Sequence, residues 1–443
     1  MEIEAALDPG RYVHDGACVS FVGDLHEVEA RVAGLVEVAP ERAVALYQAF
    51  LAGCYEKADE VDDSSGSFGM FVTALVCGWV KARQRAGGAA DQTASRLLRW
   101  MEEDPYGFLY RLDSDVADAL DRAGLTAMVD LVQARFDAVE QATRQVDERA
   151  RREREAARRR WGEALRNLYA AQRVIDAYVR HAQETGLTVS DCATVARLLV
   201  AHGRRDEALS WVERGIDLDA NTPYGSVGGH ELRELRPRLL KDLGREGEAL
   251  DAAWAEYRRH PSAYAYDHLM TFAPEADLAS WQEKAIEVAM TGAYLPSAIE
   301  LLVHTHRTGQ LAELVRRSSD EALAALSHFW AEPAAQNLAD KHPDQAARLY
   351  RAQGLRILEA RKSKHYDAAL RYFTHARRCY EAAGLAAEWE QLVDEVYTRH
   401  HRKTSFVPRF EEIVTGSGPR RERSFLDRAK SRWVHAEESS PIA

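Results

Sequence analysis

The stretch that decides the fold is Gly203–Leu209 (GRRDEAL), which recurs 41 residues later as Gly244–Leu250 (GREGEAL). A third copy, Lys364–Leu370 (KHYDAAL), lies close to four such periods after the first, and a degenerate turn occurs at Gly309–Leu311. Self-similarity at a fixed period is the sequence signature of a repeat protein. We therefore expect the second half of the chain to be built from repeated units.

The pattern within each copy predicts a helix-turn-helix unit. The glycine supplies a left-handed residue at the end of the first helix at no steric cost. Acidic residues then open the second helix, where the helix dipole favours them. Each hairpin has an apolar face that only a stacked neighbour can bury, which predicts an α-solenoid. The turn resembles that of tetratricopeptide repeats, although the period is nearer HEAT lengths. The alternative is an irregular helical bundle in which two similar turns arose by chance.

The rest of the 443-residue chain also favours helices. Its commonest residues are strong helix formers, and no stretch alternates apolar and polar residues between turn signals as a surface strand does. Apolar residues recur instead at helical spacing, for example Cys192, Val195 and Leu199. The predicted fold is all-α, with about 18–20 helices of ordinary length.

Composition shifts divide the chain into four predicted parts. They are an N-terminal helical block at 1–143, a charged connecting helix at 144–160, the helical-repeat array at 161–403, and a basic cap and tail at 404–443.

Local signals predict two boundaries inside the N-terminal block. A polar turn precedes the expected helix Phe68–Lys81, and either Ser65 or Ser67 can cap it. The sequence Asp104–Gly107 (DPYG) is expected to end another helix, because proline and glycine break helical pairing.

Charge and composition exclude several classes of protein. The net charge is −12 and the pI is near 5.8, which argues against a protein that coats nucleic acid over its whole surface. The longest apolar runs, such as Phe71–Val76, are too short to span a membrane, and the N-terminus lacks the pattern of a signal peptide. Five scattered cysteines without a C-x-x-C pair are typical of free thiols in a reducing compartment. We expect a cytoplasmic protein without a membrane segment.

Residues 161–403 resemble the helical-repeat region that follows the SWIM zinc finger in a group of bacterial proteins of unknown function. Matching stretches include Leu198–Gly215 (LLVAHGRRDEALSWVERG) and Lys364–Arg399. The N-terminal block is similar to the region that precedes the array in that family, so the resemblance covers roughly residues 4–415. The SWIM finger itself needs C-x-C and C-x-H ligand pairs, which this chain lacks. The resemblance therefore implies an all-α, intracellular array, and neither zinc binding nor finger-mediated contact with nucleic acid carries over.

No motif predicts a catalytic, cofactor or metal site. His375 and Cys379 share a helix face, but two ligands do not make a zinc site. The acidic loop around Asp62 fails the ligand spacing of a calcium-binding EF-hand. The glycine-rich loop Asn221–His230 lacks a phosphate-binding lysine, and no G-x-S-x-G nucleophile motif occurs. We expect a protein that is not an enzyme and that has no cofactor.

Two basic segments are candidates for binding a partner. The run 144–160 has eight arginines against four acidic residues, and it is either a phosphate-contacting strip or a solvated helix supported by pairs such as Glu148–Arg152. At the C-terminal end, basic and aromatic residues interleave. The predicted partner-binding residues are Arg402, Lys403, Phe406, Arg409 and Phe410. The alternative for this second segment is a structural cap that docks its phenylalanines on the array.

These observations lead to three functional hypotheses. The first is a non-enzymatic scaffold that presents a groove to a protein or peptide partner, as stacked helical repeats commonly do. The second is a nucleic-acid-associated protein that uses the two basic segments. The third is an enzyme whose site is assembled from distant helices and is not visible in the sequence.

Overall fold

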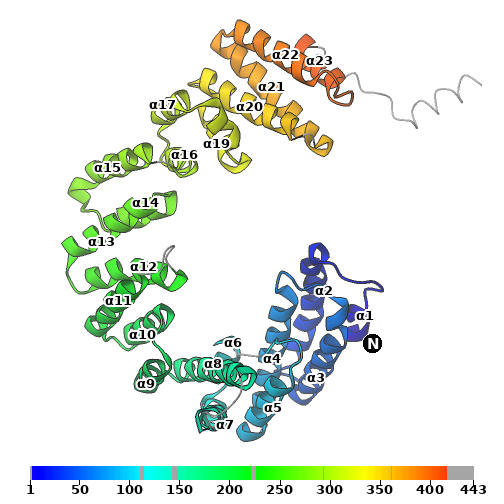
Figure 1. The fold of residues 1–443 in the computed structure, drawn as a ribbon, viewed down its shortest axis with the longest axis vertical. Helices are drawn as coiled ribbons and strands as arrows, with labels where there is room; N and C mark the ends of the chain where they lie inside the picture. Colours follow the sequence, from blue (N-terminus) through cyan, green and yellow to red (C-terminus); the bar gives the residue numbers. More distant parts are fainter. Residues whose placement is uncertain are drawn as a thin grey trace, which may run out of the picture. The chain divides into compact units, whose positions relative to one another are not determined.

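The computed structural model describes residues 2–109, 114–141, 148–220, 226–292, 294–360 and 362–416. Within these residues the chain forms 23 α-helices and three short 3-10 helices (Figure 1). The described residues contain no strand, only one isolated bridge between Val13 and Val61. The prediction of an all-α fold is therefore confirmed. The α-helices outnumber the predicted set partly because α1, α6 and α18 have only six residues each, too few to show an apolar period in the sequence.

The chain divides into two compact units, Met1–Arg245 and Glu246–Ala443. The helices of the first unit are α1 (Glu2–Leu7), α2 (Asp15–Ala33), α3 (Pro40–Lys57), α4 (Ser67–Arg85), α5 (Ala90–Glu103), α6 (Ser114–Ala119), α7 (Arg122–Gln141), α8 (Glu148–Ala171), α9 (Ile175–Thr185), α10 (Val189–Ala201), α11 (Arg205–Asp219) and α12 (Val227–Asp242), with η1 (Ala58–Glu60). The division into four predicted parts stays a prediction.

The helices of the second unit are α13 (Glu246–Arg259), α14 (Ala263–Met270), α15 (Leu278–Thr291), α16 (Leu295–His304), α17 (Thr308–Arg317), α18 (Asp320–Ala325), α19 (His328–Leu338), α20 (Pro343–Glu359), α21 (Tyr366–Ala383), α22 (Ala386–His400) and α23 (Val407–Thr415), with η2 (Glu275–Asp277) and η3 (Ser363–His365). Helices that are neighbours in sequence pack together, such as α20 on α21, and alternate helices such as α14 and α16 also touch. This stacking makes the fold an all-α solenoid.

The repeated turn has the predicted conformation at its first two copies. Gly203 and Gly244 have φ angles of 73° and 75°, in the left-handed region that glycine reaches without strain. After Gly203, the acidic residues Asp206 and Glu207 occupy the first turn of α11, and Ala208 is buried against its neighbours. The turn predicted at Gly309–Leu311 lies inside α17 instead.

The cap predicted for the helix after the polar loop is wrong. Helix α4 begins at Ser67 and its N-cap residue is Gly66, while the Ser65 hydroxyl accepts only a long bond, 3.5 Å, from the Ser67 backbone N–H. The Asp63 carboxylate accepts hydrogen bonds from the backbone N–H groups of Phe68 and Gly69, both at 2.8 Å. The Ser65 hydroxyl instead donates to the Ser67 hydroxyl, so the capping oxygen comes from further back in the loop.

The charged run lies in the first half of α8. The predicted pair between Glu148 and Arg152 is present at 3.1 Å, and Arg149 pairs with Glu153 at 2.9 Å. The same helix then continues into the core, where Trp161 and Leu165 are buried. Residues 144–147 of the run lie outside the described residues.

Each unit has its own apolar core. That of the first unit centres on large buried side chains of α3 and α4, among them Tyr47, Phe50 and Trp79. That of the second includes Tyr257 and the aromatic residues of α21 and α23. Within the part of the chain that the structure describes, no helix combines the length and the apolar character that a membrane crossing requires.

Candidate functional site in a groove between α3 and α5

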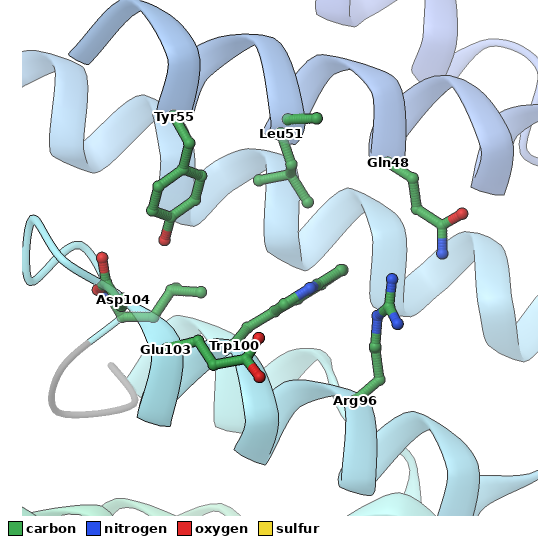
Figure 2. A pocket seen from close by; sticks show the side chains of 9 residues that line it. Gln48, Leu51, Tyr55, Arg96, Trp100, Glu103 and Asp104 are labelled. Atoms are coloured by element: carbon green, nitrogen blue, oxygen red, sulfur yellow. The ribbon is translucent and has the colours of Figure 1, made fainter. Parts of the chain in front are cut away.

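A cavity of about 290 Å³ lies between α3 and α5 in the first unit (Figure 2). Helix α3 contributes one wall, α5 contributes the other, and the loop after α5 closes one end. The lining residues are Gln48, Leu51, Ala52, Tyr55, Arg96, Trp100, Glu103, Asp104 and Leu109. We call this cavity the α3/α5 groove.

The α3 wall follows from helical spacing. Gln48, Leu51 and Tyr55 are three and four residues apart, so they lie on one face of the helix. The neighbouring face carries Tyr47 and Phe50, which are buried in the core. Core packing therefore fixes the orientation of α3 and turns its Gln48–Tyr55 row toward α5.

The α5 wall is a matching row of Arg96, Trp100 and Glu103. Helix α5 buries Leu97 and Met101 on one side, which leaves Trp100 half-buried at the edge of the apolar face. The Trp100 ring packs on the buried Trp79 ring, with centroids 4.5 Å apart. The Arg96 guanidinium lies 5.5 Å from the centroid of the Trp100 ring, a cation–π contact.

The groove is apolar in the middle and charged at its ends. Leu51 and Trp100 face each other at the centre, with Arg96 toward one end and Glu103 and Asp104 toward the other (Figure 2). Arg96 and Glu103 are both exposed at the rim. The adjacent Glu102 pairs with Arg135 at 2.7 Å.

The acidic end is built by the predicted helix stop at Asp104–Gly107, which is confirmed because α5 ends at Glu103. The Asp104 carboxylate accepts backbone hydrogen bonds from Tyr106, Gly107 and Leu109, at 3.2, 3.1 and 2.6 Å. These bonds fix the loop against the end of the groove.

A tyrosine hydroxyl lies at this acidic end. The Tyr55 hydroxyl is buried and faces the Asp104 carboxylate. Burial, and then the negative charge of Asp104 and a hydrogen bond to it, raise the pKa of Tyr55. The hydroxyl therefore stays protonated at neutral pH.

The residues predicted to bind a partner lie elsewhere, at the end of α22 and in α23. Phe406 and Phe410 are fully buried, so a partner cannot reach their rings. Arg409 pairs with Asp367 at 2.5 Å, and the Lys403 ammonium donates to the Tyr366 hydroxyl at 3.1 Å. Arg402 is exposed. Contact of these basic residues with a partner stays a prediction.

The residues that line the groove are not among those predicted from the sequence. Each wall shows a helical spacing in the sequence. Gln48, Leu51 and Tyr55 are separated by three and then four residues, and Arg96, Trp100 and Glu103 by four and then three. No sequence signal, however, indicates that α3 and α5 face each other. Among the described residues, no cluster of His, Cys, Asp and Glu could hold a metal ion, and all five cysteines are free thiols.

A second, more polar cavity of about 580 Å³ lies between α7, α8 and α9. Its charged side chains partly neutralise one another, since Arg158 pairs with Glu140. The buried His181 ring also lines it, within 3.1 Å of the Gly162 carbonyl oxygen and edge-on to the Phe136 ring. Burial lowers the pKa of His181, although the contact with Gly162 opposes this effect.

This histidine gives a prediction for stability against pH. Because its pKa is lower in the folded state than the unfolded value of about 6.5, the unfolded chain binds this proton first as pH falls. We expect the folded state to lose stability between pH 7.5 and 5, and the His181→Gln variant to lose less over that range. The midpoint of thermal unfolding at both pH values measures the effect. The exposed His202→Gln is the control, and an equal change in the two variants would contradict the prediction.

The stacked hairpins and the groove between two of their helices place this chain in the class of helical-repeat proteins. Within that class it belongs to the DUF6880 family, a family of unknown function whose model matches residues 12–409. No curated protein matches the sequence. Among solved structures, the chain is similar to a circular tandem repeat protein with novel repeat topology and enhanced subunit contact surfaces, at 15% identity. That match covers 94% of this chain and 96% of the other, with a TM-score of 0.17.

Proposed function

We propose that this protein is a non-enzymatic helical-repeat scaffold that binds a protein or peptide partner in the α3/α5 groove. The observation that carries the proposal is the composition of the groove, whose aromatic and aliphatic centre lies between an exposed arginine at one end and acidic side chains at the other. Aromatic and arginine side chains in such settings commonly anchor protein interfaces.

Two further features of the groove favour binding over catalysis. Its volume of about 290 Å³ is at the lower limit for small-molecule sites, which are typically about 300–1,000 Å³. Its buried hydroxyl, that of Tyr55, has a pKa that is raised away from neutrality, and a general acid or base works best near the operating pH. Both features suit recognition of a side chain.

The nucleic-acid hypothesis remains the alternative function, and it rests on the basic segments. Several of their arginines are already engaged with carboxylates, because Arg151 and Arg152 share Glu148 while Arg409 pairs with Asp367. Phosphate binding would have to compete with these pairs. We also propose a cytoplasmic location, from the free cysteines, and the kinship with SWIM-associated repeat regions, from the sequence resemblance.

The test compares two arginine substitutions on the same helix. Ala52 is exposed and lines the α3/α5 groove, so Ala52→Arg should fill the groove without removing a core side chain. Ala49 is also exposed on α3 but lies outside the α3/α5 groove, which makes Ala49→Arg the matched control. We expect Ala52→Arg to reduce capture of the partner about tenfold or more, and Ala49→Arg to leave capture unchanged.

The measurement is affinity capture from native cytosol at low and at physiological salt. Bound proteins are quantified by mass spectrometry, and bound nucleic acid by the ratio of absorbance at 260 and 280 nm. Equal capture by wild type and Ala52→Arg would overturn the proposal. Nucleic acid that is retained at low salt and released at physiological salt, without a protein partner, would favour the alternative function.

A further inference from the structure

We propose that the α3/α5 groove binds an extended peptide segment in which an apolar residue lies between an acidic residue and a basic residue. The inference rests on the proposed function and names the chemistry of the partner. In the complex the acidic side chain contacts Arg96, the apolar side chain lies between Leu51 and Trp100, and the basic side chain contacts Glu103.

The centre of the groove selects an apolar anchor. The half-buried Trp100 supplies most of the exposed apolar surface, and the buried side chains of Leu51 and Leu109 form the aliphatic floor beside it. Trp100 is held from behind by Trp79, so it is already oriented for a ligand. A rigid aromatic surface loses little conformational freedom when it is covered.

The spacing of the rim charges selects the length of the segment. Arg96 and Glu103 are seven residues apart on one helix, which corresponds to about 10.5 Å along its axis. A peptide extended in the polyproline II conformation advances about 3.1 Å per residue with three residues per turn, so two residues that are three apart lie on the same face, about 9 Å apart. An acidic and a basic residue three positions apart, with the anchor between them, therefore match the separation of the backbone positions of Arg96 and Glu103.

The acidic end of the groove disfavours nucleic acid. Glu103 and Asp104 both line it, and their negative charges would repel a phosphate group. Among the described residues that line the groove, Arg96 is the one basic residue. A ligand that carries both signs of charge therefore complements the groove better than a polyanion does.

The test uses the full-length protein and four fluorescein-labelled peptides, whose binding is measured by fluorescence anisotropy. Two peptides carry the mixed-charge cores Glu-Leu-Phe-Lys and Lys-Leu-Phe-Glu, which represent the two chain directions. The other two carry Glu-Leu-Phe-Glu and Lys-Leu-Phe-Lys. We expect wild type to bind at least one mixed-charge peptide about tenfold more tightly than either like-charge peptide.

Charge-reversal variants then test which groove residue contacts the acidic side chain of the peptide and which contacts the basic one. Arg96→Glu makes both ends acidic and should shift the preference to the Lys/Lys peptide, whereas Glu103→Arg should shift it to the Glu/Glu peptide. The double variant should prefer mixed charge again. A gain of binding to a different peptide cannot result from misfolding, and Arg99→Glu, on the exposed side of α5 outside the groove, controls for net charge.

Three outcomes would overturn the inference. They are equal binding of all four peptides by wild type, loss of binding in Arg96→Glu without a gain for the Lys/Lys peptide, and no binding of any peptide. If no peptide binds but Ala52→Arg still abolishes partner capture, the inference fails while the proposed function stands. If Ala52→Arg leaves capture unchanged, the proposed function fails as well.

Discussion

Replacing Phe410 with alanine is expected to destabilise the fold by about 3–5 kcal/mol, the usual cost of removing a buried phenylalanine. Phe410 is fully buried, and its ring packs on those of Phe373 and Phe406, with centroids 5.2 and 5.5 Å apart. Trp389 and Tyr397 complete the cluster. Loss of this ring would leave a cavity where α23 docks on α21 and α22.

Urea unfolding followed by circular dichroism measures this change in the free energy of unfolding. Arg402→Ala is the control, because Arg402 is exposed on the adjacent turn and such surface changes usually stay within about 0.5 kcal/mol. A Phe410→Ala protein as stable as wild type would mean that the ring is not a core residue, which would return it to the set of partner contacts.

Replacing Asp219 with alanine is expected to have a comparable effect, about 3–5 kcal/mol, because it breaks a buried ion pair. The Asp219 carboxylate is 2% exposed and accepts a hydrogen bond from Arg233 at 2.7 Å. It also accepts bonds from the Ser226 backbone N–H and hydroxyl, at 2.8 and 2.6 Å, and so holds the residue that caps α12. The loss would leave the Arg233 charge in a largely buried place.

The control for this variant is Asp217→Ala, an exposed aspartate two residues earlier in α11. Burial acts to raise the pKa of Asp219, but the bonds from Ser226 and Arg233 outweigh it, and the net pKa is lowered. The carboxylate is therefore charged at pH 7, where unfolding should be measured. Its contribution is lost only as pH falls through this lowered pKa. Equal stability of the two variants at pH 7 would contradict the prediction.

The Asp219 carboxylate also explains one glycine of the glycine-rich segment Asn221–His230, Gly229. A Cβ atom on Gly229 would lie 2.0 Å from an Asp219 carboxylate oxygen, so the position accommodates only a hydrogen. The glycine allows close packing of α12 on the end of α11. Residues 221–225 of the loop lie outside the described residues.

Several features of this protein follow from the sequence alone. Local rules act over a few residues, and they correctly gave the helical fold, the stacked hairpins, the left-handed Gly203 and the end of α5 before Asp104. They also gave the Glu148–Arg152 pair, because residues four apart on a helix are always neighbours. These features can be predicted without knowing which helices pack against each other in the folded protein.

Other features were decided only by the tertiary structure. Helical spacing shows that Phe406 and Phe410 share a face, but it does not show whether α21 or a partner covers that face. The α3/α5 groove likewise depends on tertiary packing. It forms because the core orients α3 and α5 so that Gln48–Tyr55 faces Arg96–Glu103. The physical reason is that the spacing of apolar residues along one helix determines which face of that helix is buried. Which other helices cover that face is determined by packing between segments that are far apart in the sequence.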